Sequence, residues 1–163
     1  MSIVRVRALS VRFGASLAFV ALILALPGPV RAGSSLPVET VTIETTKGRT
    51  AFQAEIADTA QERSQGLMFR QSMPQGHAML FDFGKPRAVA MWMKNTRISL
   101  DMIFADNRGK VIAVAEDTVP FSTDTISVNE PVRAVLEVNA GTARRIGLKP
   151  GGRLIHPLFG RGG

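Results

Sequence analysis

The sequence predicts a mainly β protein, a small β-sandwich or barrel that carries two short helices. Two observations lead to this fold class. From about residue 39 onward, apolar and polar residues alternate over short segments, which is the pattern of half-buried strands. No long amphipathic segment separates these strands, whereas a doubly wound parallel sheet needs a helix between most of its strands.

The first two strands are expected at residues 39–45 and 51–57. Each has apolar residues at every second position, which places them on one face of the strand. A Lys-Gly pair at 47–48 has the composition of a hairpin turn. The alternating apolar residues of this predicted hairpin are Val41, Ile43, Phe52, Ala54 and Ile56.

The same alternation continues along the rest of the chain. An Asp-Asn-Arg-Gly sequence at 106–109 is a strong turn signal between two of the segments. The further strands are expected at residues 79–83, 89–93, 100–104, 110–116, 132–138 and 153–158.

Two short helices are expected among these strands. Thr59 and Glu62 have the spacing of a capping box, and Gly66 is positioned to end that helix. A second helix is expected to begin with Asn139 as its N-cap and to end at Gly147.

The first 32 residues have the pattern of an export signal. Three arginines precede an apolar run at 13–26, a Pro-Gly-Pro sequence ends this run, and Val30 and Ala32 are small residues at the positions that a signal peptidase reads. A helix that spans a membrane needs roughly 20 apolar residues, and this run has 14. The sequence therefore predicts cleavage after Ala32 and an exported, periplasmic protein. An uncleaved segment would instead anchor the domain to the membrane.

Residues 33–39 are then expected to be a linker and residues 40–163 a single β domain, since this length suits one domain. The signal holds four of the 20 basic side chains and none of the 13 acidic ones, so cleavage lowers the formal charge from +7 to +3. This small charge does not favour nucleic acid as a partner. Because the chain has no cysteine, a thiol nucleophile and a thiolate metal site are excluded.

Candidate functional residues concentrate in the stretch 91–104 and in the strand at 132–138. Asp101 and Glu137 each lie within an apolar strand, and a buried carboxylate needs hydrogen-bond donors because an isolated buried charge is costly. Arg70 and Lys94 are candidate partners for Asp101.

Several motifs resemble the domain-of-unknown-function family 192. They follow the family's order over residues 40–157, and Trp-Met-Lys-Asn-Thr at 92–96 is the most specific of them. The resemblance implies a jelly-roll-like β domain and no assigned activity. The chain departs from the family pattern at Ala78, where glycine is usual, and at Gly152, where an acidic residue often follows the late glycine. The other motifs are residues 52–58, Glu-Arg at 62–63, Gly-Leu-Met-Phe-Arg at 66–70, Met-Leu-Phe at 79–81, Leu-Asp at 100–101 with Phe104, Leu-Glu at 136–137, Ala-Gly at 140–141, Gly-Leu at 147–148 and Pro-Gly at 150–151.

The function we expect is non-enzymatic binding of a small polar ligand or a partner protein. A tryptophan, an amide and several charges close together are the groups that a polar pocket uses to orient a ligand. The alternative is a structural network in which Arg70 or Lys94 neutralises Asp101 and Trp92 fills the core. The expected ligand-binding residues are Arg63, Arg70, Trp92, Lys94, Asn95, Asp101 and Glu137.

Two other functions are open. Asp101 and Glu137 could serve a hydrolase as paired carboxylates, which glycoside hydrolysis requires on both sides of one cleft. The six methionines from residue 68 to residue 102 could bind Cu(I) through their soft thioethers. The strand spacing of Met79, Met91, Met93 and Met102 instead favours core packing. We expect no catalytic residue, no cofactor and no metal site.

Overall fold

The structure, a computed structural model, describes residues 36–160. The predicted signal peptide and the start of the predicted linker lie outside the described residues. No helix within residues 36–160 is long and apolar enough to cross a membrane. The elements are β1 (Val38–Thr45), β2 (Gly48–Ala57), α1 (Ala60–Gln65), β3 (His77–Arg87), β4 (Ala90–Met91), β5 (Leu100–Ala105), β6 (Val111–Ala115), β7 (Ile126–Ser127), β8 (Val132–Asn139), α2 (Thr142–Ile146), β9 (Arg153–Ile155) and a 3₁₀ turn (Pro157–Phe159).

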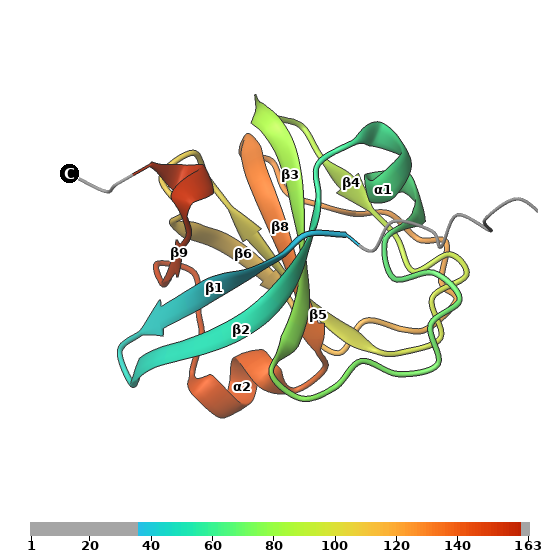
Figure 1. Ribbon diagram of the computed structural model, residues 1–163, viewed down its shortest axis with the longest axis horizontal. Coiled ribbons are helices and arrows are strands. Elements are labelled where there is room, and N and C mark those ends of the chain that lie inside the picture. Colours follow the sequence, from blue (N-terminus) through green and yellow to red (C-terminus); the bar gives the residue numbers. More distant parts are fainter. Residues whose placement is uncertain (1–35, 161–163) are drawn as a thin grey trace, which may run out of the picture. The chain divides into compact units, whose positions relative to one another are not determined.

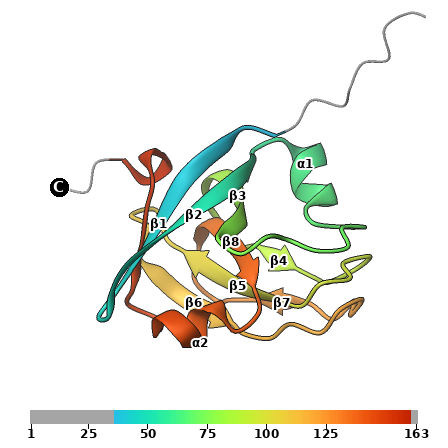
Figure 2. The same cartoon turned by 60° about the horizontal axis from the view of Figure 1, so that its bottom comes forward.

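Seven strands form one curled sheet in the order β6-β5-β8-β3-β2-β1-β9 (Figures 1 and 2). All neighbours are antiparallel except β2 and β3, which are parallel and are joined through α1. The two edges of the sheet meet at one corner, where the Leu154 N–H donates to the Gly109 carbonyl at 2.7 Å and the Val111 N–H donates to the Gly152 carbonyl at 2.8 Å. The predicted small, mainly β barrel-like fold with two short helices is confirmed.

The curled sheet has a separate apolar core on each face. The barrel interior contains alternating residues from all seven strands, among them Val41, Phe52 and Leu136, and α2 packs against it at one end (Figure 1). The outer face of the central strands β3, β5 and β8 forms the second core, which is covered by α1, the loops and the two-stranded β4–β7 sheet. The candidate site lies in this second layer.

The capping box that the sequence predicts for α1 is present. The Thr59 hydroxyl accepts the Glu62 N–H at 3.2 Å, and the Glu62 carboxylate accepts the Thr59 N–H at 2.9 Å. The prediction for α2 was wrong at its start: Asn139 is the last residue of β8, and Gly141 is the N-cap. The Asn139 amide instead donates to the Met73 carbonyl at 2.9 Å.

Two strand predictions also needed correction, and one short strand was not predicted. The segment at 89–93 forms only the two-residue strand β4, and its partner β7 was not predicted. The last strand ends at Ile155 rather than at residue 158, because Pro157 begins a 3₁₀ turn that the His156 side chain caps. Proline lacks the N–H that a continuing strand would donate.

Candidate functional site

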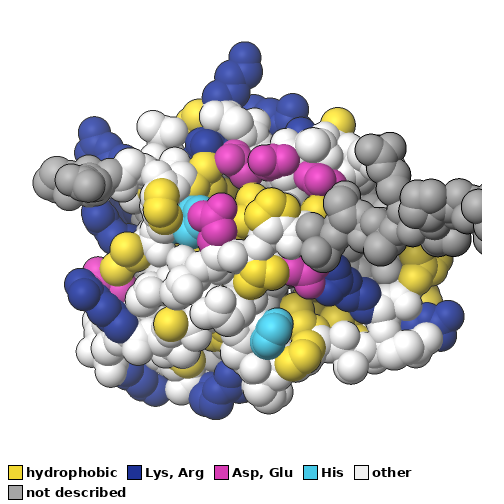
Figure 3. Space-filling model, in the orientation of Figure 1, with side chains coloured by type: hydrophobic (Ala, Val, Ile, Leu, Met, Phe, Trp, Pro, Cys, Tyr) yellow, Lys and Arg dark blue, Asp and Glu magenta, His cyan; other side chains and the backbone are white. Residues whose placement is uncertain are grey.

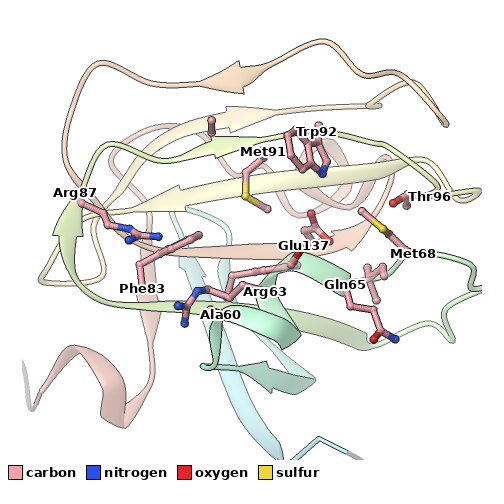
Figure 4. Close-up of a pocket in the computed structure, with 15 residues that line it drawn as sticks. Ala60, Arg63, Gln65, Met68, Phe83, Arg87, Met91, Trp92, Thr96 and Glu137 are labelled. Atoms are coloured by element: carbon pink, nitrogen blue, oxygen red, sulfur yellow. The ribbon is translucent and has the colours of Figure 1, made fainter.

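A cavity of about 230 Å³ lies between α1 and the outer face of the sheet (Figure 4). Its floor comes from β3 and β8, and its walls come from α1, the loop after α1 and the chain from β4 onward. The lining residues are Ala60, Arg63, Ser64, Gln65, Gly66, Leu67, Met68, Phe81, Phe83, Arg87, Ala90, Met91, Trp92, Thr96 and Glu137.

Glu137 is the acidic group of this cavity. It lies in β8 and is only 4% exposed, with Met79 of β3 and Met102 of β5 as its partners in the neighbouring strands. Within residues 36–160, no hydrogen bond or ion pair engages its carboxylate, which points into the cavity, where its oxygen atoms are reached by solvent (Figure 4). Burial alone raises the pKa of Glu137 to about 8. A carboxyl group in this state can donate a hydrogen bond when protonated or pair with a cation when ionised.

Two arginines mark the other end of the cavity. The guanidinium carbon atoms of Arg63 and Arg87 lie 5.6 and 5.2 Å from the centre of the Phe83 ring, within the range of cation–π attraction. Arg63 also donates from Nη1 to the carbonyls of Asp58 and Asp82, the latter at 2.6 Å. Backbone carbonyls and one aromatic ring therefore hold these two charges in place.

Trp92 forms part of the wall beside Glu137 and remains 50% exposed. Backbone hydrogen bonds connect the loop after Trp92 to two other loops. The Phe69 N–H donates to the Asn95 carbonyl at 2.9 Å, and the Phe121 N–H donates to the Thr96 carbonyl at 3.0 Å. Phe69, Asn95 and Phe121 all adopt positive φ, which is unfavourable for residues with a Cβ. This backbone arrangement presents the large side chains of Phe69 and Phe121 to solvent.

Asp101 lies outside the cavity and has a structural role. It is fully buried, and its carboxylate accepts the N–H groups of Asp117 at 2.9 Å, Gly141 at 3.2 Å and Ala143 at 2.8 Å. The last two belong to the start of α2, so Asp101 caps this helix from another strand. The expectation that Arg70 or Lys94 neutralises Asp101 was wrong, because backbone N–H groups satisfy it.

The other expected ligand-binding residues also lie away from the cavity lining. Arg70 forms a two-pronged ion pair with Glu55, with distances of 2.5 and 2.6 Å. Lys94 is exposed, and the Asn95 amide lies 3.9 Å from the Met68 sulfur. Of the seven residues, the structure brings Arg63, Trp92 and Glu137 together and does not bring the other four into the lining.

The geometry argues against the paired-carboxylate hypothesis. The register pairs Asp101 with Val138 and Met102 with Glu137, so the two carboxylates point to opposite faces of the sheet. They therefore cannot flank one substrate. Of the four methionines whose strand spacing favoured the core, Met79, Met93 and Met102 are buried in the core of the outer face, whereas Met91 is half-buried and lines the cavity. Met73, which lies outside the predicted strands, is also buried in this core.

Sequence reasoning did not identify most of the cavity walls. Leu67 and Met68 lie in a motif that the family resemblance includes, so this resemblance was the available signal. Phe81 and Phe83 alternate in the strand as core residues do. No sequence pattern indicated Arg87 as a cavity residue. Its position depends on a register shift between Asp82 and Arg87 in the pairing of β3 with β8.

Comparisons with known proteins agree with this architecture. A protein of Sinorhizobium meliloti, described as a proposed transcription regulator, has a crystal structure with a TM-score of 0.73 and 45% identity, covering 75% of this chain and 95% of that one. A protein of unknown function from Novosphingobium aromaticivorans has a TM-score of 0.74 and 36% identity, covering 81% of this chain and 94% of that one. A comparison with curated proteins gave no match. Residues 41–156 match the family described as Uncharacterized ACR, DUF192. The chain therefore belongs to the DUF192 family.

Proposed function

We propose that this protein is an exported binding domain that takes up a small ligand in the cavity between α1 and the sheet. The observation that carries the proposal is Glu137, a carboxylate that is 4% exposed, has no partner within the described residues and points into the cavity. Burial disfavours the ionised form of this carboxylate and raises its pKa. A ligand that satisfies Glu137 would therefore gain binding energy from an interaction that the empty protein lacks.

The shape of the cavity supports a small molecule as the ligand. Ligand sites combine apolar walls with a few polar groups that fix orientation. Here Phe81, Met91 and Trp92 provide apolar surface, while Glu137 and Arg63 provide charge. Nothing in this arrangement requires a reaction, so binding without catalysis remains the proposal.

Tryptophan fluorescence tests the binding proposal, because Trp92 is the only tryptophan of the chain and lines the cavity. The protein is expressed with its own N-terminal segment, purified, and screened against small charged and neutral metabolites. We expect a saturable change in Trp92 fluorescence with some compounds, and loss of that change in Glu137→Gln. Glu130→Gln, at an exposed position, is the matched control. A screen in which no compound changes the fluorescence or the melting temperature would reject the proposal.

A second candidate is Cu(I) binding, favoured by one observation. Met68 and Met91 line the same cavity as Glu137, and their thioethers appear on its two sides in the view of Figure 4. Thioethers favour soft monovalent metals. Ag(I), which mimics Cu(I) without redox chemistry, would quench Trp92 fluorescence in wild type and not in Met68→Leu with Met91→Leu. Met73→Leu is the control. The arginines at the rim make a cation the less favoured ligand.

The export part of the proposal rests on the pattern of residues 1–32 alone. Its test is fractionation of cells that produce the full chain, followed by mass spectrometry of the product. A periplasmic product that begins at Gly33 supports the proposal, whereas a cytoplasmic product that retains residue 1 contradicts it.

We do not carry the description of the Sinorhizobium meliloti relative as a transcription regulator over to this chain. On the face seen in Figure 3, basic side chains are scattered around the perimeter and acidic ones gather near the centre. DNA binding depends on a continuous basic surface. That nucleic acid is not a partner stays a prediction, which a DNA mobility-shift assay at low salt tests.

A further inference from the structure

We propose that the ligand of this cavity is a zwitterion, whose ammonium group pairs with Glu137 and whose carboxylate pairs with Arg63 and Arg87 across an apolar spacer. This inference rests on the proposed function above and names the ligand class of the same cavity. Three features of the cavity support it: an acidic end, a basic end and apolar surface between them.

The acidic end is Glu137. The residue is 4% exposed, its carboxylate opens only into the cavity, and it has neither an ion pair nor a hydrogen bond within residues 36–160. An ammonium group placed beside it would supply both, because each N–H can donate to a carboxylate oxygen. The pair would also be strong, since charges attract more in a site that excludes water. The nearby ring of Trp92 offers an aromatic surface that suits an alkylammonium group.

The basic end is formed by Arg63 and Arg87 around Phe83. No carboxylate in the described part of the chain pairs with either guanidinium, although Asp82 nearby pairs with Arg133 instead. Arg63 uses only Nη1 for the carbonyls of Asp58 and Asp82, so its other nitrogen atoms are available to a ligand. Guanidinium groups bind carboxylates through two parallel hydrogen bonds, which makes a ligand carboxylate the natural partner here.

The two ends are separated by more than an ion-pair distance. No ion pair within residues 36–160 joins Glu137 to Arg63 or Arg87. Figure 4 shows Glu137 beside Met91 and Trp92, with both guanidinium groups at the opposite end near Phe83. The surface between them includes Phe81 and Met91. A ligand that satisfies both ends therefore needs several bonds between its ammonium and carboxylate groups, as in an ω-amino acid or a short peptide.

Isothermal titration of the purified protein with a series of ω-amino acids tests this inference. The probes are 4-aminobutanoate, 6-aminohexanoate and 8-aminooctanoate, with hexylammonium and hexanoate as compounds that each keep only one charge. We expect one zwitterion to bind at least about tenfold more tightly than either singly charged compound, which corresponds to about 1.4 kcal/mol. With a pKa of about 8, Glu137 is mostly protonated near pH 7 in the empty protein. An ammonium group pairs with its ionised form, so binding should release a proton. Titration in buffers of different ionisation enthalpy detects this release.

Two substitutions test which residues bind the ammonium group and which bind the carboxylate of the ligand. In Glu137→Gln, the zwitterion should bind no more tightly than hexanoate. In Arg87→Gln, it should bind no more tightly than hexylammonium. Arg108→Gln, at an exposed turn, is the control for overall charge. If hexanoate or hexylammonium binds as tightly as every zwitterion, the ligand class is wrong while the cavity remains a binding site. If none of these compounds binds and the wider fluorescence screen is also negative, both the ligand class and the proposed function fail.

Discussion

Asp101 and Glu137 lie on neighbouring strands, yet their carboxylates occupy opposite faces of the sheet, because Met102 rather than Asp101 is the strand partner of Glu137. The difference in environment follows from this register. Asp101 points toward the barrel interior, where three backbone N–H groups surround it. Glu137 points into the cavity, where no donor from residues 36–160 meets it. One carboxylate therefore stabilises the fold, and the other is available to a ligand.

Asp101→Asn is expected to destabilise the fold and leave ligand binding intact. The variant removes the charge that caps α2 and turns one acceptor oxygen into an amide donor that faces backbone N–H groups. Loss of charged hydrogen bonds at a buried site costs on the order of 3 kcal/mol. Urea unfolding followed by circular dichroism measures the change. Asp124→Asn, at an exposed position, should change the free energy of unfolding by less than about 0.5 kcal/mol. Equal stability of the two variants would contradict the capping role.

Gly109→Ala is expected to disrupt the corner where the two edges of the sheet meet. Gly109 has a φ of 76°, and a Cβ there would overlap the Leu154 carbonyl oxygen and press on the Phe159 ring. Gly84 has the same φ, with no atom within 4 Å of such a Cβ, and so it is a matched control. Gly84→Ala should cost about 1 kcal/mol for its backbone alone. Gly109→Ala should cost about 3 kcal/mol or more, since a steric overlap is added. Thermal unfolding compares the two, and similar melting temperatures would show that the corner is unimportant to stability.

The two helices show which features of the fold can be predicted from sequence. The cap of α1 is local, because Thr59 and Glu62 are three residues apart and satisfy each other's backbone N–H groups. The cap of α2 is not local, because its acceptor is Asp101, 42 residues before Ala143 in the chain. Asn139 is of a residue type that favours the N-cap, so the local sequence points to it. Only the strand register reveals the actual partner.

The candidate site shows the same limit. Glu137 could be identified because a carboxylate within an apolar strand is unusual, and Trp92 because it lies in a distinctive motif. Which sheet face each carboxylate points to depends on pairing between distant strands, which alternation within one strand does not determine. The meeting of Arg63 and Arg87 on Phe83 likewise depends on the packing of α1 against β3.

Glu55→Gln is expected to lower stability slightly at neutral pH and not at low pH. The hydrogen bonds from Arg70 lower the pKa of Glu55. A carboxyl group whose pKa falls on folding adds stability above its unfolded pKa, and this stability is lost as the pH falls through the folded pKa. The pair is partly exposed, with 35% of the Arg70 side chain and 24% of the Glu55 side chain accessible, so the loss should be below about 1 kcal/mol. Urea unfolding of wild type and variant at neutral pH and well below pH 4 makes the comparison. If the difference in free energy of unfolding between wild type and Glu55→Gln grows as the pH falls, the Arg70–Glu55 ion pair does not contribute the expected stability.

Glu137→Gln is expected to stabilise the empty protein at alkaline pH. Burial raises the pKa of Glu137 to about 8 in the folded state from an ordinary value of 4.5. A carboxyl group whose pKa rises on folding favours the folded state fully below its unfolded pKa, and that contribution is lost as the pH rises toward the folded pKa. Wild type should therefore lose stability between about pH 4.5 and pH 8, by on the order of 4 to 5 kcal/mol, and then level off.

Glutamine has the size of protonated glutamate and no charge, so Glu137→Gln should lack this loss. The variant and wild type should have similar free energies of unfolding near pH 5, whereas the variant should be several kcal/mol more stable near pH 9. Urea unfolding across this pH range measures the difference, and Glu130→Gln controls for surface charge. Parallel stability curves for Glu137→Gln and wild type would show that the carboxylate is hydrated in solution. The acidic end of the proposed ligand site would then lose the property that makes a cationic group its favoured partner.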